Sequence, residues 1–246
     1  MIEPEIAVFG DIHSNLEALE AVFADMDSIG VRDRVCLGDI VGYAANPSEC
    51  LELVRSTGCQ VVQGNHDAWA ADDSVLDELR DVAQRGIEFS RRKLTPEQRS
   101  YLAGLPLDIC VGDCQYVHAS LDVPAEWLYV VGEQDARDHF RAQTHPISFC
   151  GHTHLPRLWL QRASGAITAW HGEGRIELPS VGKILINAGS VGQPRDLCPD
   201  ACYAVFDAGD RWVEFRRVPY DIGQTKRKIA RVKLPRFTAQ RLSLGR

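Results

Sequence analysis

Apolar residues in the first third of the chain alternate between short unbroken runs and runs with helical spacing. Residues 5–9 form an unbroken apolar run and predict a buried strand. Within residues 19–26, large apolar side chains recur every three or four positions, which is typical of the buried face of a helix. Ser14-Asn-Leu-Glu17 precedes this run and has the form of a capping box, so it predicts the start of that helix.

The same alternation continues to residue 62. Residues 34–37 and 60–62 predict a second and a third strand. Between them, Asn46-Pro47-Ser-Glu49 places an N-cap, a proline at the first helical position and an acid in the first turn. Strand, helix, strand, helix and strand in this order indicate βαβ units on a parallel sheet.

The pattern changes after residue 72. Residues 72–104 favour helix, with a restart at Thr95-Pro96-Glu-Gln98, and from about residue 106 short strands dominate. The expected strands are 109–111, 116–118, 147–150, 158–161, 167–170, 184–187, 203–206 and 212–217. The last two are expected to pair, and the set as a whole suggests a second sheet packed on the first. Because no repeat or Gly/Ser linker interrupts the chain, residues 1–246 are expected to form a single domain.

Composition narrows the class of protein. The chain has 246 residues, 45% of them hydrophobic, and a formal net charge of -7, so it can bury a sizeable core and its overall charge does not favour nucleic acid. No run approaches the length of about 20 apolar residues that spans a bilayer, and Met1-Ile-Glu-Pro-Glu does not resemble a signal peptide. We therefore expect a cytoplasmic protein without membrane contact; the oligomeric state stays open, and a homo-oligomer is compatible with the sequence.

A basic C-terminal extension begins at about residue 224. The stretch 212–246 holds ten Lys/Arg against two acids. It could form an arm for an anionic substrate, a nucleic acid or a partner subunit, but basic runs without interleaved aromatics are usually solvated. The favoured interpretation is a solvated tail whose removal leaves metal binding intact.

The eight cysteines lack zinc-ribbon spacing. Cys110 and Cys114 share a three-residue spacer, as do Cys198 and Cys202. Either pair could form a disulfide or a soft-metal site, but reduced thiols are the expected state in a cytosolic chain.

Polar motifs follow the predicted strands in a fixed order. They are Asp11-Ile-His13, Gly38-Asp39-Ile-Val-Gly42, Gly64-Asn65-His66-Asp67, His118, and Gly151-His152-Thr-His154. Residues at i and i+2 of an extended segment point the same way, so each Asp/His or His/His pair can converge. Open α/β sheets bind their ligands beyond the strand ends, which is where these motifs lie.

The donor types in these motifs indicate metal. Asp11 and Asp39 repel each other unless a cation separates them. Asn65 can ligate through its amide oxygen, and Asp67 is a candidate to orient the imidazole of His66. Together the motifs supply enough carboxylate, amide and imidazole ligands for two adjacent cations, roughly 3–4 Å apart, which is the arrangement of phosphate-ester hydrolases.

In this order the motifs resemble those of the calcineurin-like metallophosphoesterase superfamily. The segment Asn187-Ala-Gly-Ser-Val-Gly-Gln-Pro-Arg195 is similar to one in its small bacterial and archaeal phosphodiesterase branch. Two departures are Ala119, where glycine is usual, and Ala188, where proline is usual; both concern substrate fit and remove no ligand. The resemblance implies an α/β fold, a four-layer αββα sandwich of two mixed β-sheets flanked by helices.

The resemblance also implies roles for the motif residues. One metal would be held by Asp11, His13 and His154, the other by Asn65, His118 and His152, with Asp39 bridging them. His66, oriented by Asp67, would be the catalytic imidazole. Arg195 is a candidate contact for the substrate phosphate, with a structural ion pair as the alternative.

The expected function is dinuclear metal-dependent hydrolysis of a small phosphate ester, favouring a phosphodiester attacked by a metal-bridging hydroxide. The two divalent ions could be manganese, iron, zinc, cobalt or nickel, because the ligands are oxygen and imidazole. One alternative is a phosphomonoesterase acting on proteins or nucleotides. The other is a non-catalytic metal-binding scaffold.

Overall fold

The computed structural model describes residues 5–72 and 81–246. Its strands are β1 (Glu5–Phe9), β2 (Asp33–Cys36), β3 (Gln60–Val61), β4 (Asp108–Val111), β5 (Cys114–Val117), β6 (Ile147–Cys150), β7 (Arg157–Gln161), β8 (Ile167–His171), β9 (Gly174–Glu177), β10 (Lys183–Asn187), β11 (Ala201–Asp207) and β12 (Trp212–Val218). Its helices are α1 (Leu16–Ser28), α2 (Pro47–Ser56), α3 (Asn65–Ala71), α4 (Asp81–Lys93), α5 (Pro96–Ala103), the 3₁₀ turn η2 (Pro124–Glu126), α6 (Glu133–Ala142), α7 (Ile222–Arg231) and α8 (Arg236–Leu242).

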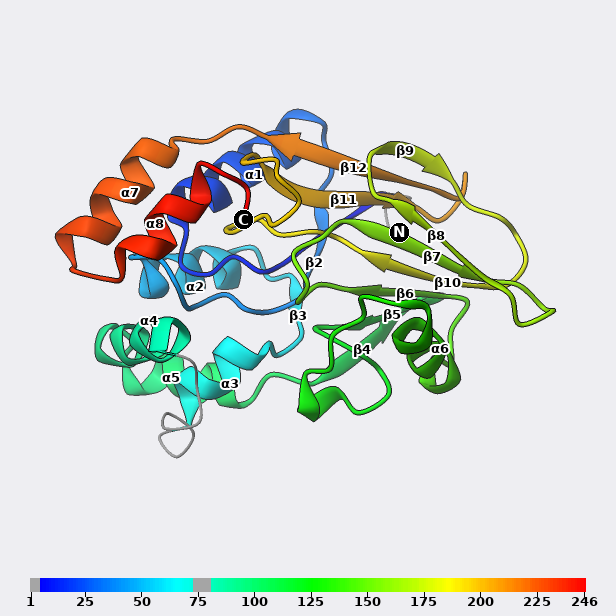
Figure 1. The fold of residues 1–246 in the computed structure, drawn as a ribbon, viewed down its shortest axis with the longest axis horizontal. Coiled ribbons are helices and arrows are strands. Elements are labelled where there is room, and N and C mark those ends of the chain that lie inside the picture. The colour runs from blue at the N-terminus through cyan, green and yellow to red at the C-terminus, as the bar shows by residue number, and fades with distance from the viewer. Residues whose placement is uncertain (1–4, 73–80) are drawn as a thin grey trace.

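Within these residues the strands form two six-stranded sheets (Figure 1). The first has the order β3-β2-β1-β11-β12-β9 and the second β4-β5-β6-β10-β7-β8. Strands β1, β2 and β3 are parallel, as the βαβ pattern predicts, whereas β11 is antiparallel to β1. Both sheets are therefore mixed.

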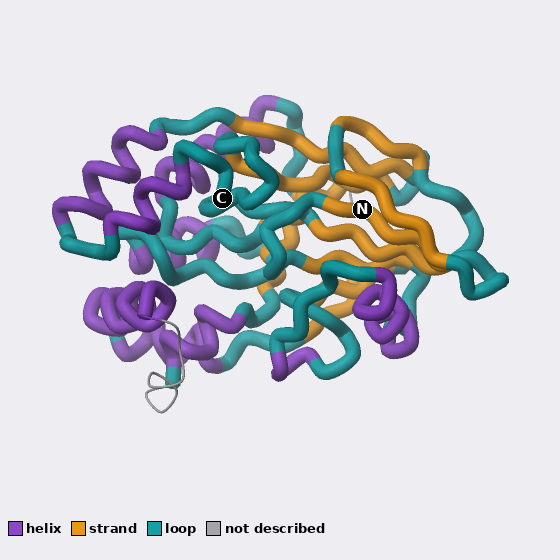
Figure 2. Tube along the Cα trace, viewed as in Figure 1, coloured by secondary structure: helices purple, strands orange, loops and turns teal. Residues whose placement is uncertain are grey.

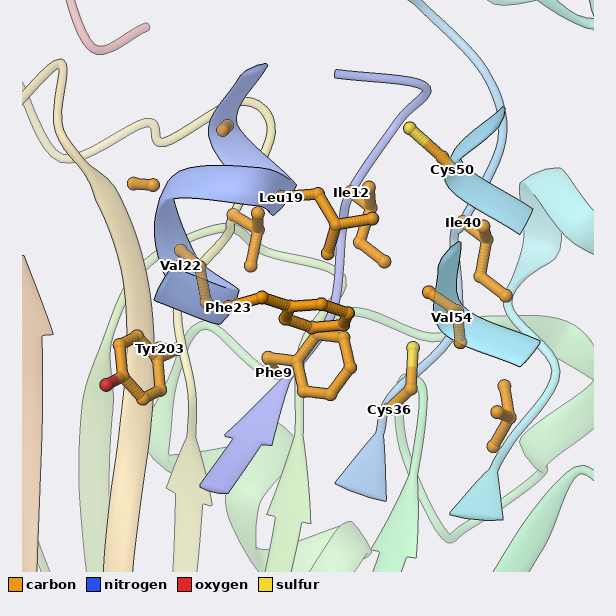
Figure 3. Close-up of a cluster of buried hydrophobic side chains, with 14 of the residues drawn as sticks. Phe9, Ile12, Leu19, Val22, Phe23, Cys36, Ile40, Cys50, Val54 and Tyr203 are labelled. Atoms are coloured by element: carbon orange, nitrogen blue, oxygen red, sulfur yellow. The ribbon is translucent and has the colours of Figure 1, made fainter. Parts of the chain in front are cut away.

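Three hydrophobic clusters define four layers. Alternate residues of β1 face opposite ways, so Phe9 packs under α1 and α2 while Val8 packs between the two sheets. The first cluster is shown in Figure 3, where Phe9 meets Phe23 of α1 edge to face. A third cluster joins Leu185 of the second sheet to Phe140 of α6. The order helix, sheet, sheet, helix confirms the expected αββα sandwich.

Several local expectations need correction. The cap of α1 is Asn15, whose side chain accepts from the Ala18 amide, because Ser14 instead accepts from the Gly42 amide. The capping box at Thr95 is confirmed, whereas helical residues expected at 73–80 lie outside the described residues.

Helices α3 and α6 and strand β9 were not expected from the sequence pattern. Strands β11 and β12 pair as predicted, but they extend the first sheet and not the second.

Interpreting the basic C-terminal stretch as a solvated tail is wrong. Helices α7 and α8 lie side by side at the end of the molecule that also carries α4 and α5, away from most of the strands (Figure 2). Ile229, Leu234 and Leu242 are buried in a cluster with Phe89 of α4. Thr225 also donates to the Asn15 side chain, so the stretch is built into the body.

Removing residues 225–246 is therefore expected to destabilise the protein. The deletion takes Ile229, Leu234 and Leu242 out of a buried cluster, and each buried aliphatic side chain contributes about 1.5–3 kcal/mol. Chemical denaturation should show a clearly lower midpoint for the shortened chain, whereas Arg231→Gln, an exposed change in the same stretch, should not move it. An unchanged midpoint after deletion would restore the solvated-tail interpretation.

The other two general expectations concern cysteines and membranes. All eight cysteines lie in described residues, and each is a free thiol. Among the described residues, no helix combines the length and the apolar character needed to cross a bilayer.

Candidate metal centre

The predicted ligands converge at one edge of the sandwich. They come from the ends of four strands and the start of α3, and each is at most 6% exposed. They are Asp11 and His13 after β1, Asp39 after β2, Asn65 in α3, His118 after β5, and His152 and His154 after β6. The structure therefore brings together every side chain that the motifs nominated as a ligand.

The backbone achieves this convergence in an unexpected way. Asp11, His13, Asp39, His152 and His154 all have positive φ, between 49° and 65°, so they are not extended as the i, i+2 argument assumed. For a non-glycine residue such a conformation costs about 1–3 kcal/mol and persists only where the surroundings impose it.

Hydrogen bonds between the loops impose this conformation. The amides of Ile12 and His13 both donate to the carbonyl of Asp39 at 2.9 Å, and the Gly151 amide donates to the carbonyl of His118 at 2.9 Å. The loops after neighbouring strands thus fix one another through the protein's own hydrogen bonds.

The imidazoles are oriented by main-chain carbonyls. His118 Nδ1 lies 2.8 Å from the Leu37 carbonyl, His154 Nδ1 lies 2.6 Å from the Gln193 carbonyl, and His13 Nδ1 lies 3.3 Å from the Val41 carbonyl. A carbonyl only accepts, so each Nδ1 carries the proton and each Nε2 carries a lone pair. Ligating histidines are commonly oriented in this way by a carbonyl at the other ring nitrogen.

The lone pairs then face one another. The Nε2 atoms of His13 and His154 are 3.1 Å apart, and His118 Nε2 is 3.0 Å from Asn65 Oδ1. With the Nδ1 protons committed to carbonyls, neither contact is a hydrogen bond. Facing lone pairs at this distance are favourable only when a cation lies among them.

The described residues offer three groups of possible metal donors, and Asp39 belongs to two of them. Asp11, His13 and His154 offer atoms within 4.8 Å of one another, and so do Asp39, His118 and His152. Asp39 Oδ2 lies 3.4 Å from His118 Nε2 in the second set and 3.6 Å from His13 Nε2 in the first. Asp39 is therefore placed between the sets, as a bridging carboxylate would be.

The charges in the centre also favour cations. Burial lowers the pKa of His13, His118 and His154, so these imidazoles are neutral ligands at neutral pH. Burial, reinforced by the charge of Asp11, holds the pKa of Asp39 well above its usual range.

Buried polar atoms without hydrogen-bond partners also indicate that this centre binds a metal ion. Within the described chain, Asp11 Oδ1 and His152 Nε2 are buried and have no hydrogen-bond partner. The other oxygen of Asp11 accepts from the His152 amide at 2.9 Å, so Oδ1 is left facing the first set. Leaving a buried carboxylate oxygen unsatisfied is costly, and a divalent ion would satisfy it. These residues fit a bound divalent metal ion.

Two motif glycines allow the close approach of these groups. A Cβ on Gly64 would lie 2.2 Å from Asp39 Oδ1, and a Cβ on Gly42 would lie 2.6 Å from His66 Nδ1. Gly42 also has φ +132°, a conformation that L side chains rarely adopt. The glycines thus bring the loops against the ligands.

His66 lies at the centre, but Asp67 does not orient it. Asp67 accepts the amides of Ile40 and Gly64 at 2.9 and 3.1 Å, so its carboxylate braces the loops. Within the described chain His66 Nδ1 has no partner. Within the described residues Asp67 therefore accepts no hydrogen bond from the His66 ring, and its predicted orienting role is wrong. His66 also lies near His13 and Asp39 at a distance compatible with ligation, so its geometry alone does not separate a catalytic from a ligating role.

The segment 187–195 has a supporting role that the motifs did not predict. Asn187 donates to the Gly151 carbonyl at 2.5 Å, and Ser190 donates to the Asp11 carbonyl at 2.9 Å. Together with the Gln193 carbonyl that contacts His154, these bonds hold Asp11, His154 and the backbone just before His152.

A pocket of about 730 Å³ opens over the centre. It is lined by Asp39, Asn65, His66, His152 and His154 from the motifs and by the predicted Arg195. Aromatic walls and residues of the C-terminal helix were missed by sequence reasoning: Tyr43, Trp69, Trp127, Tyr129, Phe237 and Arg241. Tyr43 directly follows Gly42 and could have been found from the motif, whereas Arg241 lies in a stretch without a distinguishing pattern.

The comparison with protein families identifies the superfamily to which this domain belongs. Residues 5–211 match the model of the calcineurin-like phosphoesterase superfamily domain. The chain belongs to the calcineurin-like phosphoesterase superfamily. Because members of this family depend on metal, the family places the chain among the metal-dependent phosphoester hydrolases, and the buried His/Asp groups could bind that metal.

Individual relatives agree with this assignment. The uncharacterized protein MJ0912 of Methanocaldococcus jannaschii is 39% identical over 250 residues, covering all of both chains. A metallophosphoesterase from Sphaerobacter thermophilus is 35% identical, with a TM-score of 0.87 over 98% of this chain and 99% of that one. The hypothetical protein PH1004 from Pyrococcus horikoshii OT3 shares the fold, with 21% identity and a TM-score of 0.81 over 98% of each chain.

Proposed function

We propose that this superfamily member is a dinuclear metal-dependent phosphodiesterase. The observation that carries the proposal is the position of Asp39 Oδ2 within 3.6 Å of imidazoles from both donor sets. A carboxylate shared in this way supports two neighbouring ions, which is the arrangement suited to in-line displacement at phosphorus.

The residues of the centre would have different roles. Asp11, His13 and His154 would hold one ion, Asn65, His118 and His152 the other, and Asp39 would bridge them. Bound divalent ions lower the pKa of coordinated water and neutralise charge on phosphate oxygens. His66 lines the pocket and would be the side chain that protonates the leaving oxygen.

The pocket supports a diester as the preferred substrate. A volume of about 730 Å³ with aromatic walls has room for organic groups on both sides of a phosphate. A cytoplasmic location and a small phosphate-ester substrate remain part of the proposal, and a homo-oligomer stays open.

A phosphomonoesterase is the second candidate, and Arg241 favours it. A monoester carries two charges and needs a more cationic pocket than a diester, and Arg241 adds a second guanidinium to that of Arg195. The comparison of the two substrate types below decides between the candidates.

Purified protein is expected to hydrolyse bis(p-nitrophenyl) phosphate in a metal-dependent manner. A chelator should abolish release of p-nitrophenol and manganese should restore it, because oxygen and imidazole ligands leave the ions exchangeable. The decisive measurement is kcat/KM for bis(p-nitrophenyl) phosphate against p-nitrophenyl phosphate at the same pH and metal concentration. A clear monoester preference would select the phosphomonoesterase, and full metal occupancy without turnover of either would select the scaffold.

A further inference from the structure

Arg195 and Arg241 reach the same pocket from distant parts of the chain. Arg195 ends the glycine-containing segment after β10, and Arg241 lies on α8, near the C-terminus, which Figure 1 shows in red. Helix α8 is fixed, because Leu242 and Thr238 are 3% and 1% exposed. The position of Arg241 in the pocket wall therefore follows from the packing of the helix.

Neither guanidinium has a carboxylate side chain as a partner within the described chain. Arg195 donates to Gln193 Oε1 at 3.2 Å, while its buried Nε has no hydrogen-bond partner there. Arg241 donates a hydrogen bond from Nε to the main-chain oxygen of Arg246. Its guanidinium lies over the Phe237 ring, 5.3 Å from the ring centre. Glu126 also lines the pocket, but it forms no ion pair with either arginine in the described residues.

The charge of Arg195 acts on Arg241. The pKa of Arg241 is lowered by burial and by the charge of Arg195. Two like charges that line one partly buried pocket repel, and an anion bound between them would remove the repulsion.

The two arginines also differ in which residues they contact. The Arg195 amide donates to the carbonyl of the ligand His154, whereas Arg241 is anchored to Phe237 and the end of the chain. Arg195 therefore borders the metal centre through its backbone, whereas Arg241 lines the same pocket from α8. A phosphate on the metals leaves Arg241 available for another group of the same molecule.

We propose that Arg195 and Arg241 form an anion subsite, so that the preferred substrate is a phosphodiester carrying a second anionic group beyond the scissile phosphate. The proposal rests on the proposed phosphodiesterase function. It assigns the basic C-terminal helix a role in substrate selection.

A matched pair of chromogenic diesters tests the subsite. One is the p-nitrophenyl ester of thymidine 5′-phosphate, and the other is the same ester with an additional 3′-phosphate. Because charge-assisted hydrogen bonds to a second anion add to binding, we expect the 3′-phosphate to raise kcat/KM about tenfold or more, mainly through KM. Both esters release p-nitrophenol, so one assay serves for both.

The variant Arg241→Gln should reduce this preference to about twofold or less, since it removes the charge that binds the second anion. Arg236→Gln is the matched control, because Arg236 is exposed on the same helix and does not line the pocket. Thermal unfolding of both variants checks that the helix still packs. A binding measurement independent of turnover compares thymidine 3′,5′-bisphosphate with thymidine 5′-phosphate by calorimetry, where Arg241→Gln should narrow the affinity difference and Arg236→Gln should not.

The outcomes separate the subsite from the proposed function. Equal kcat/KM for the two thymidine esters in the unaltered protein, with bis(p-nitrophenyl) phosphate still hydrolysed, overturns the subsite alone. A preference that persists in folded Arg241→Gln overturns it as well. Failure to hydrolyse any diester at full metal occupancy overturns the phosphodiesterase function, and the calorimetric comparison then still reports whether the second anion is bound.

Discussion

Replacing Asp39 with asparagine is expected to lower turnover of a phosphodiester by on the order of 10³-fold, because a bridging carboxylate supports both ions and their charge stabilisation is worth several kcal/mol. Asparagine keeps the shape of the side chain and an oxygen that can accept from the His66 amide, as Asp39 Oδ1 does at 2.7 Å. The loss should therefore reflect the missing charge and not a collapsed loop. Metal analysis should show fewer than two ions per chain.

Asp122→Asn provides the control for this change. Asp122 is exposed on the loop after β5 and does not line the pocket, so its replacement should leave both metal content and turnover as they are. If Asp39→Asn retained two ions and near-normal turnover, the bridging role of Asp39 would have to be abandoned.

Replacing His66 with alanine is expected to leave metal content unchanged and to lower kcat by roughly 10²-fold or more, the usual contribution of a general acid. The ligand sets are complete without His66, while its ring lines the pocket next to Asp39. Metal analysis and kcat on bis(p-nitrophenyl) phosphate are measured on the same preparation.

Replacement of a histidine outside the pocket provides the control for His66→Ala. His171 is exposed on β8 outside the pocket, so His171→Ala should behave like the unaltered protein in both measurements. A loss of bound metal in His66→Ala would show that His66 is a ligand, as its position near His13 and Asp39 allows. The catalytic assignment would then fail.

The sequence predicts the positions of the ligands better than the means by which they converge. Asp11 and Asp39 follow unbroken apolar runs, and such runs are readable as buried strands without tertiary information. The left-handed backbone at these residues is set by hydrogen bonds between loops that are distant in sequence, such as His13 to Asp39. No local pattern encodes those bonds.

The role of Asp67 and the place of Arg241 escaped sequence reasoning for the same reason. Asp67 follows His66 directly, which suggested a pair, but the start of α3 turns its carboxylate onto the amides of Ile40 and Gly64. Arg241 reaches the pocket only because α7 and α8 fold back over α4. Long-range packing of this kind overrides what composition suggests about a basic stretch.

The position of β11 beside β1 has a consequence for the synthesis of the protein. Every proposed ligand precedes residue 155, yet β1, which ends just before the ligand Asp11, pairs with residues 204–207 of β11. Pairing across such a separation is slow to form, and domains fold as units during translation. The nascent chain would thus hold all its metal donors well before it could order them. Metal ions in the cell would first contact histidines that are not yet held in place. The ordered centre would form only after the second half of the chain has been made.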